Sequence, residues 1–237
     1  MGIEVIAFGP HPDDAEMGCG GLLLKMKDQG HKTGIIDLTL GELSTNGSLQ
    51  TRAQETRKAT AFLKLDVRDN LGLEDGNIKN DLASRNMVVE AIRRYRPHMV
   101  LIPYHKDRHP DHENAHKLLK DSIFASGLAK FGRGQSHRPH IVACYMLHEA
   151  FEPRFIVDIT QYFEQKMQAV TSYRSQLHSS VKKNAPTWLS SKYFKDLLDA
   201  RHKCYGLKVM AQYGEPYFAE YDIKVDQPLQ FFDYLKI

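Results

Sequence analysis

Short apolar runs alternate with helix-length segments of mixed polarity along this chain of 237 residues. Residues 3–8 form an apolar run that ends at Gly9-Pro10, and residues 16–29 then carry apolar side chains at helical spacing before Gly30. Repeated alternation of this kind favours right-handed strand–helix–strand crossovers and a parallel sheet covered on both faces. Strands are predicted at residues 3–8, 32–38, 67–71, 98–102, 141–147 and 155–159, and helices at 16–29, 51–63, 82–96, 110–126, 161–174 and 193–206.

These elements predict one Rossmann-like, doubly wound α/β domain with a mostly parallel sheet flanked by helices. Residues 1–160 are expected to form its core, and residues 161–237 a C-terminal helical extension. No internal repeat, low-complexity tract or linker divides the chain, so a single domain is expected.

The composition excludes several classes of partner. Lys and Arg number 32 against 29 Asp and Glu, so the net charge of +3 gives no electrostatic case for binding nucleic acid. No window approaches the roughly 20 apolar residues of a membrane span, and the N-terminus lacks the pattern of a signal peptide, so no membrane attachment is expected. Cys19, Cys144 and Cys204 are too few and too scattered for a disulfide framework, which favours a cytoplasmic protein with reduced thiols.

Polar clusters follow two of the predicted strands. The first, His-Pro-Asp-Asp-Ala-Glu, occupies residues 11–16, and the second, Asp-Arg-His-Pro-Asp-His, occupies residues 107–112. Open parallel sheets bind ligands at the carboxyl ends of their strands, beside the point where the strand order reverses. We therefore expect both clusters to contribute to one site.

His11, Asp14 and His112 are the candidate metal ligands. His11 and Asp14 lie three residues apart in a turn, and His112 near the start of a helix can complete the set. A zinc ion with three protein ligands and one open position polarises a carbonyl and activates water near neutral pH, although other divalent first-row ions also suit such ligands. Alternatively, Asp14 is a helix N-cap and His112 a surface histidine. The presence of His and Asp at both strand ends favours the metal site.

Three further side chains in the clusters suit proton transfer during amide hydrolysis. Asp13 is placed to take a proton from the attacking water. His109 can polarise the carbonyl oxygen or protonate the leaving nitrogen, and Asp111 can hold the His109 ring. Considered alone, Asp13 is more typical of a helix N-cap, and His109 of a surface histidine.

The two clusters resemble the LmbE-like family of zinc-dependent deacetylases, which includes N-acetylglucosaminyl-phosphatidylinositol deacetylases and the deacetylases of the mycothiol and bacillithiol pathways. The motifs that carry the resemblance are HPDDAEMGCGG at residues 11–21 and RHPDH at residues 108–112. The loop GELSTNG at residues 41–47, followed by Arg52 in TRAQE, resembles the bacillithiol branch in particular. The likeness covers roughly the first 160 residues.

The resemblance implies hydrolysis of the N-acetyl group of an N-acetylglucosamine-type small molecule, with N-acetylglucosaminyl malate as the first candidate. Chitobiose, a glycolipid or a thiol conjugate are the alternatives. It assigns one zinc ion to the ligands named above, Asp13 as the general base, and His109 with Asp111 as the electrophilic pair.

The same resemblance implies residues that contact the substrate. Arg52 and Arg108 would bind the sugar or its anionic aglycone, because malate brings two carboxylates that a guanidinium binds bidentately. In the alternative interpretation Arg52 is only a charged residue in the first turn of a helix. Tyr193 is the candidate for a C-terminal tyrosine near the oxyanion. A homo-oligomer, a hexamer or a trimer, is also implied.

A competing motif lies inside the second cluster. His112, Glu113 and His116 match the HExxH pattern of zinc metalloproteases. That interpretation leaves the first cluster without a role and begins at a helix start next to Pro110, so His116 is expected on the helix surface.

A binding module without catalysis is the other alternative. A dinucleotide-binding domain would show GxGxxG after its first strand, where this chain has His-Pro-Asp-Asp. The glycine-rich residues 18–21 are instead predicted to allow close packing of the first helix against the sheet.

Overall fold

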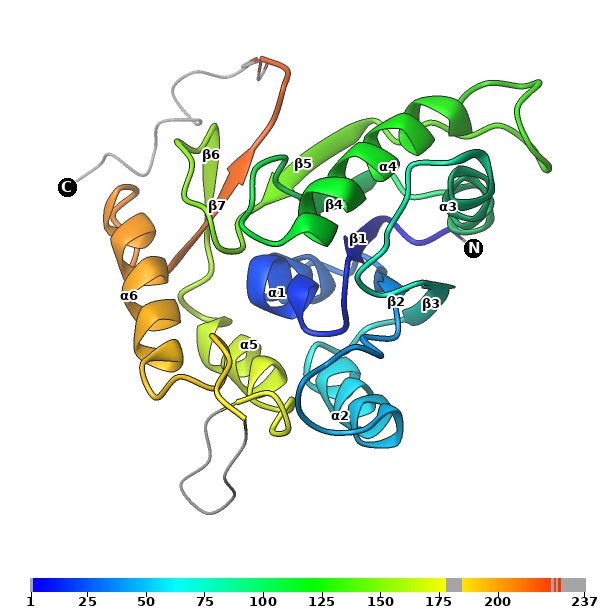
Figure 1. Ribbon diagram of the computed structural model, residues 1–237. Coiled ribbons are helices and arrows are strands. Elements are labelled where there is room, and N and C mark those ends of the chain that lie inside the picture. The colour runs from blue at the N-terminus through cyan, green and yellow to red at the C-terminus, as the bar shows by residue number, and fades with distance from the viewer. Residues whose placement is uncertain (1, 178–184, 223, 225, 227–237) are drawn as a thin grey trace.

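The computed structural model describes residues 2–177, 185–222, 224 and 226, and it contains a seven-stranded sheet between two layers of helices (Figure 1). The strand order is β3-β2-β1-β4-β5-β7-β6. The first five of these strands pair in parallel, and β7 runs antiparallel to both of its neighbours. The predicted doubly wound, mostly parallel α/β fold is therefore confirmed.

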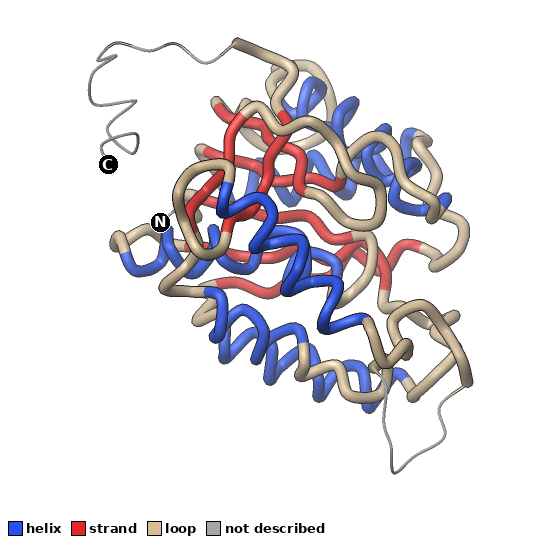
Figure 2. The backbone as a smooth tube through the Cα atoms, turned by 90° about the vertical axis from the view of Figure 1, so that its left-hand side faces the viewer, coloured by secondary structure: helices blue, strands red, loops and turns tan. Residues whose placement is uncertain are grey.

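Two hydrophobic cores fill the spaces between the sheet and its helices. One joins the sheet to α1, α2, α5 and α6, and the other joins it to α3 and α4. The two helical layers enclose the central strands in both views (Figures 1 and 2). The strands are β1 (Val5–Gly9), β2 (Thr33–Thr39), β3 (Val67–Leu73), β4 (Met99–Pro103), β5 (Ile141–Tyr145), β6 (Phe155–Asp158) and β7 (Gly214–Phe218). The helices are α1 (Asp14–Asp28), α2 (Leu49–Phe62), α3 (Leu82–Tyr95), α4 (Pro110–Ser126), α5 (Phe163–Val170) and α6 (Phe194–Leu207).

The C-terminal part of the chain differs from the sequence prediction in two ways. It supplies β7, a strand that was not predicted, between β5 and β6. Also, α5 ends at Val170, whereas a helix through residue 174 was expected. Beyond it the chain leaves the helix to bind α2, because the backbone N–H and the hydroxyl of Ser175 both donate to Glu55, each at 2.7 Å.

The glycines of α1 let this helix pack closely against its neighbours, as predicted. A Cβ atom at Gly18 would lie 2.1 Å from the ring of Tyr145 in β5. One at Gly21 would lie 2.7 Å from the Ile159 side chain. No helix among the described residues is both long and apolar enough to cross a membrane.

A buried charged cluster joins α1, α5, α6 and β7. The Lys166 ammonium lies 2.6 Å from Glu215 Oε1 and 2.7 Å from Nε2 of His202, and all three side chains are buried. The two Glu215 oxygens also accept the N–H groups of Gly21 and Leu22 in α1, each at 2.7 Å. Every member of the cluster is thus hydrogen-bonded, as buried polar groups require.

His202 makes the stability of the fold sensitive to acid. Burial, and next the adjacent Lys166, hold the pKa of His202 well below 6.5. Below pH 6.5 the unfolded chain therefore binds a proton at this position that the folded protein does not, so stability falls as the pH falls. We expect His202→Gln to reduce the loss of stability between pH 7.5 and pH 5.5 by about 1.4 kcal/mol in total, measured by urea unfolding at both pH values. The same loss of stability in His202→Gln as in the wild type would contradict the assignment of this pH dependence to His202.

Candidate metal centre and active site

The two polar clusters meet where the strand order reverses. His11, Asp13 and Asp14 follow β1, and His109 and His112 follow the adjacent strand β4, which pairs with β1 in parallel. All five line one cavity of about 320 Å³. The expected position of the site at the carboxyl ends of these strands is therefore what the structure shows.

His11, Asp14 and His112 present one ligand atom each to a common point. Asp14 Oδ2 lies 3.1 Å from Nδ1 of His11 and 3.3 Å from Nε2 of His112. All three ligand atoms lie within 4.8 Å of one another. The ligand atoms of a tetrahedral zinc ion, with bonds of about 2.0–2.1 Å, are about 3.3 Å apart. The spacing therefore suits a small divalent cation.

The other nitrogen of each histidine faces a carboxylate. His11 Nε2 lies 3.0 Å from Asp75 and 3.3 Å from Asp111, and His112 Nδ1 lies 3.1 Å from Asp107. Histidines that bind metals usually donate their second ring N–H to a carboxylate, which fixes the ring and its tautomer. Both histidines thus have a carboxylate where metal-binding histidines usually have one, but His112 Nδ1 has no hydrogen-bond partner among the described residues.

The charges around His11, Asp14 and His112 favour the binding of a cation. Burial lowers the pKa of His112, but Asp14 and Asp107 outweigh it and raise that pKa to about 9. Burial likewise opposes ionisation of Asp14, yet His112 and His11 hold its pKa well below the usual value. The carboxylates thus favour positive charge on both imidazoles. A divalent cation would supply that charge in place of the protons, so the residues fit a metal ion.

Asp13 occupies the N-cap position of α1 but does not cap the helix, since its side chain makes no capping hydrogen bond. Its φ of 127° is strained for a residue with a side chain. The carboxylate is buried, 3.3 Å from Arg52 Nη1. Burial raises the pKa of Asp13 to about 7, against the lowering effect of Arg52. A carboxylate with such a pKa suits general-base chemistry near neutral pH.

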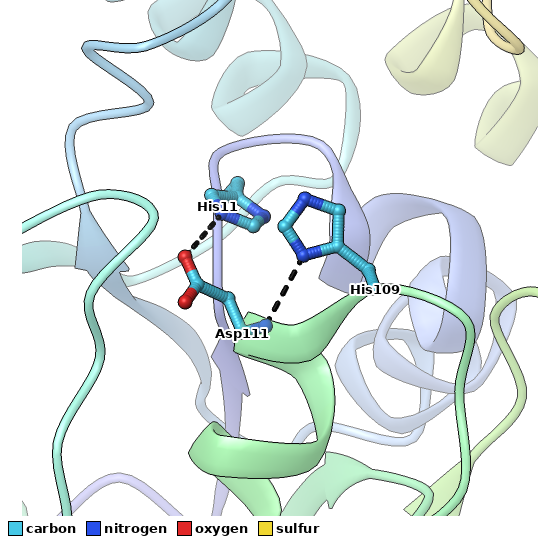
Figure 3. A group of neighbouring side chains, drawn as sticks. All are labelled: His11, His109 and Asp111. Carbon is cyan, nitrogen blue, oxygen red and sulfur yellow. Dashed lines mark hydrogen bonds and ion pairs between the residues drawn. The ribbon is translucent and has the colours of Figure 1, made fainter.

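The contact between His109 and Asp111 differs from the expected one. The Asp111 carboxylate does not hold the His109 ring but faces His11 (Figure 3) and accepts the N–H of Gly76 at 2.7 Å. Instead, the backbone N–H of Asp111 donates to His109 Nδ1 at 3.2 Å, because His109 is the N-cap of α4. Asp111 therefore orients both rings, one through its side chain and one through its backbone.

The three residues predicted to contact substrate are placed differently. Arg52 lies buried in the cavity wall, and Arg108 lines the cavity with its guanidinium 5.0 Å from the ring centre of Trp188. Tyr193 does not line the cavity. It precedes α6 with 62% of its surface exposed and lies beside Lys192, so the structure does not bring it to the cavity and the oxyanion contact stays a prediction.

Asp75, His148 and Trp188, which the sequence analysis did not single out, also line the cavity. Asp75 and His148 follow β3 and β5, so the strand-end rule that indicated the two motifs could have indicated them as well. Asp107 Oδ1 lies 2.8 Å from His148 Nδ1. Trp188 lies 4.6 Å from the His148 ring, in a segment without a predictive pattern.

The HExxH motif does not form a metal site. His116 is buried rather than exposed as expected, its Nδ1 lies 2.9 Å from the Pro103 carbonyl oxygen, and it does not line the cavity of His112. Glu113 accepts the backbone N–H of Asp107 at 3.2 Å. His112 therefore lines the active-site cavity, whereas His116 contacts the backbone of β4 outside it.

The fold and the site together define an α/β enzyme with a candidate metal centre at the switch point of its sheet. The family model described as PIG-L, GlcNAc-PI de-N-acetylase, matches residues 6–123. The crystal structure of the conserved protein TT1542 from Thermus thermophilus is 33% identical, with a TM-score of 0.86, over 94% of this chain and 98% of that one. The chain belongs to this LmbE-like family, and it is a hydrolase of the deacetylase class.

Two relatives carry substrates in their names. The diacetylchitobiose deacetylase of Thermococcus kodakarensis is 28% identical over 75% of this chain and 72% of its own length. The probable N-acetyl-alpha-D-glucosaminyl L-malate deacetylase 2 of Bacillus cereus is 27% identical over 81% of this chain and 96% of its own length.

Proposed function

We propose that this protein hydrolyses the N-acetyl group of an N-acetylglucosaminyl substrate, using one zinc ion held by His11, Asp14 and His112. The observation that carries the proposal is the position of Asp14 Oδ2 between the two imidazoles, with the Asp13 carboxylate in the same cavity. Metal ligands and a carboxylate of raised pKa are the two requirements of metal-assisted amide hydrolysis.

The side chains divide the work of the reaction. A bound zinc ion supplies Lewis acidity toward the acetyl carbonyl and makes water nucleophilic near neutral pH. Asp13 takes the proton of the attacking water and passes it to the leaving nitrogen. His109 accepts a backbone N–H at Nδ1, so its neutral ring carries the proton on Nε2. Burial, together with His112 and His11, lowers its pKa, which keeps the ring neutral as a hydrogen-bond donor to the carbonyl oxygen.

The position of Arg108 supports N-acetylglucosaminyl malate as the substrate. Arg108 is exposed at the cavity and can bind the malate carboxylates, whereas the buried Arg52 lies deeper, beside Asp13. The relative from Bacillus cereus whose name carries this substrate is matched over nearly its full length. We propose the bacillithiol pathway on this basis. We also propose the cytoplasmic location that the scattered cysteines favour, and the homo-oligomeric state, hexamer or trimer, that the resemblance implies.

Diacetylchitobiose is the second candidate. Trp188 lines the cavity and gives it an aromatic wall, and an uncharged sugar packed on such a wall needs no anionic aglycone. The relative from Thermococcus kodakarensis supports this alternative.

Arg108→Ala distinguishes the two substrates. With the malate glycoside we expect KM to rise about tenfold, since a charge-assisted contact contributes about 1.4 kcal/mol or more. With diacetylchitobiose KM should not change. Arg138→Ala is the matched control, because that exposed guanidinium lies 4.9 Å from the Phe124 ring, outside the cavity. Release of free amine is measured for both substrates. Equal KM values for variant and wild type with the malate glycoside would remove the support for malate.

A further inference from the structure

A second cavity lies behind the wall of the first. It has a volume of about 560 Å³ and is bounded by α2, β2 and β3. Among the described residues Arg52 alone lines both cavities. Pro12 lines the second cavity, whereas its chain neighbours His11 and Asp13 line the first, so the turn after β1 also separates them. The Arg52 side chain and the turn after β1 therefore separate the two cavities.

The Arg52 guanidinium has hydrogen-bonding capacity that the described residues do not use. Only 7% of its surface is exposed, yet Nε and Nη1 have no hydrogen-bond acceptor in the part of the chain that the structure describes. The Asp13 carboxylate, 3.3 Å from Nη1, provides charge but not a well-aligned hydrogen bond. Buried donors without acceptors are costly, so these N–H groups indicate a ligand.

The charges on the wall of the second cavity favour an anion. Arg68 is occupied, because it binds both oxygens of Asp37 at 2.8 and 2.9 Å and Glu16 at 2.6 Å. Arg68 therefore faces two carboxylates and is not available to a ligand. Asp69 accepts the Tyr95 hydroxyl at 2.9 Å and lies 3.3 Å from Arg94. Among the lining residues, Arg52 and the exposed Arg57 of α2 thus remain to attract a small anion.

The proposed reaction makes such an anion inside the first cavity. Hydrolysis breaks the amide C–N bond and forms a C–O bond, which yields a free amine and acetate. Acetate is produced beside the carboxylates of Asp13 and Asp14, while the amino sugar still fills the side of the cavity lined by Arg108 and Trp188. The amino sugar on that side and the unpartnered N–H groups of Arg52 both favour departure of acetate toward Arg52.

We propose that the second cavity binds the carboxylate product and is its exit path, with the Arg52 guanidinium binding acetate between the two cavities. A guanidinium fork matches a carboxylate bidentately, so its free N–H groups suit this ligand. This inference rests on the proposed function, since it requires that acetate is formed.

Ala53→Trp tests the exit path by filling the second cavity. Ala53 lines only that cavity and lies on the exposed surface of α2. We expect steady-state turnover of the preferred amide to fall at least tenfold, while the amine of the first turnover is released at the wild-type rate as a burst. Added sodium acetate should inhibit the variant at least fivefold more weakly than the wild type. Gln54→Trp is the matched control, because the neighbouring exposed residue lines neither cavity.

Each result is decisive for the exit path. A burst followed by slow turnover in Ala53→Trp alone supports it. Wild-type turnover and acetate inhibition in Ala53→Trp would overturn it, as would a slowed first turnover, which would place the effect on chemistry rather than on release. If the wild type releases acetate from none of the N-acetylglucosamine substrates, the proposed function fails and the exit path fails with it, a result distinct from an active enzyme without a burst.

Discussion

Asp13→Asn is expected to lower kcat for amide hydrolysis by about 10²- to 10⁴-fold, the usual contribution of a general base. The metal content should not change, because Asp13 is not one of the three ligands that converge at the centre. Asparagine tolerates the positive φ of this position better than most residues and keeps the volume of the side chain. The measurement is single-substrate kinetics together with the zinc content of the same preparation.

Asp81 provides the control for a purely structural role at a helix start. Its side chain accepts the Ser84 N–H at 2.8 Å and so caps α3, whereas the Asp13 side chain caps nothing. Asp81→Ala should cost about 1 kcal/mol of stability and leave kcat unchanged. An Asp13→Asn enzyme with more than a tenth of wild-type kcat, or one that has lost its zinc, would refute the assignment of Asp13 as the base.

Glu215→Ala is expected to destabilise the fold by about 3–5 kcal/mol, the usual cost of breaking a buried ion pair from one side. The substitution leaves the buried Lys166 ammonium without its carboxylate, 2.6 Å away in the wild type. It also removes the acceptor of the N–H groups of Gly21 and Leu22 in α1. Urea unfolding of both proteins at pH 7.5 measures the difference.

The ion pair of Lys120 and Glu220 is the matched control. Its N–O distance is also 2.6 Å, but more than half of each side chain is exposed. Glu220→Ala should therefore cost no more than about 1 kcal/mol. Equal losses in the two variants would show that burial does not determine the importance of the Lys166–Glu215 pair.

The fold was predictable where local pattern and tertiary packing agree. The buried strands β1 and β4 are apolar runs, VIAFG and MVLIP, and α4 begins at Pro110 as the sequence indicated. β7 escaped prediction because Gly-Glu-Pro-Tyr-Phe contains residues that strands usually avoid. Its position between β5 and β6 depends on partners distant in sequence, which a local pattern does not encode.

The site was predictable at the residues that directly follow strands. His11, Asp13, Asp14, His109 and His112 meet because parallel strands place their carboxyl ends at one edge of the sheet. The direction in which a side chain points was not predictable by this rule. The Asp111 carboxylate faces His11 rather than His109. This orientation depends on the cap of α4 by His109 and on the loop of Gly76, whose N–H the carboxylate accepts.

The proposed substrate contacts show a further limit of local reasoning. Tyr193 was assigned from the family resemblance, and it precedes α6 without lining the cavity. Trp188 reaches the cavity wall instead, from a segment whose path depends on contacts such as the ring of His148. Site residues in loops, such as Trp188, can therefore be assigned only from the folded structure.

Titration of zinc into chelator-treated protein, with release of amine from N-acetylglucosaminyl malate and diacetylchitobiose as the readout, tests the central claim most directly. We predict no turnover without metal and a maximum at one zinc ion per chain, with no recovery in His112→Ala, which lacks one of the three converging ligand atoms. Full activity of the metal-free protein, or the same recovery in His112→Ala, would contradict the assignment of the metal centre.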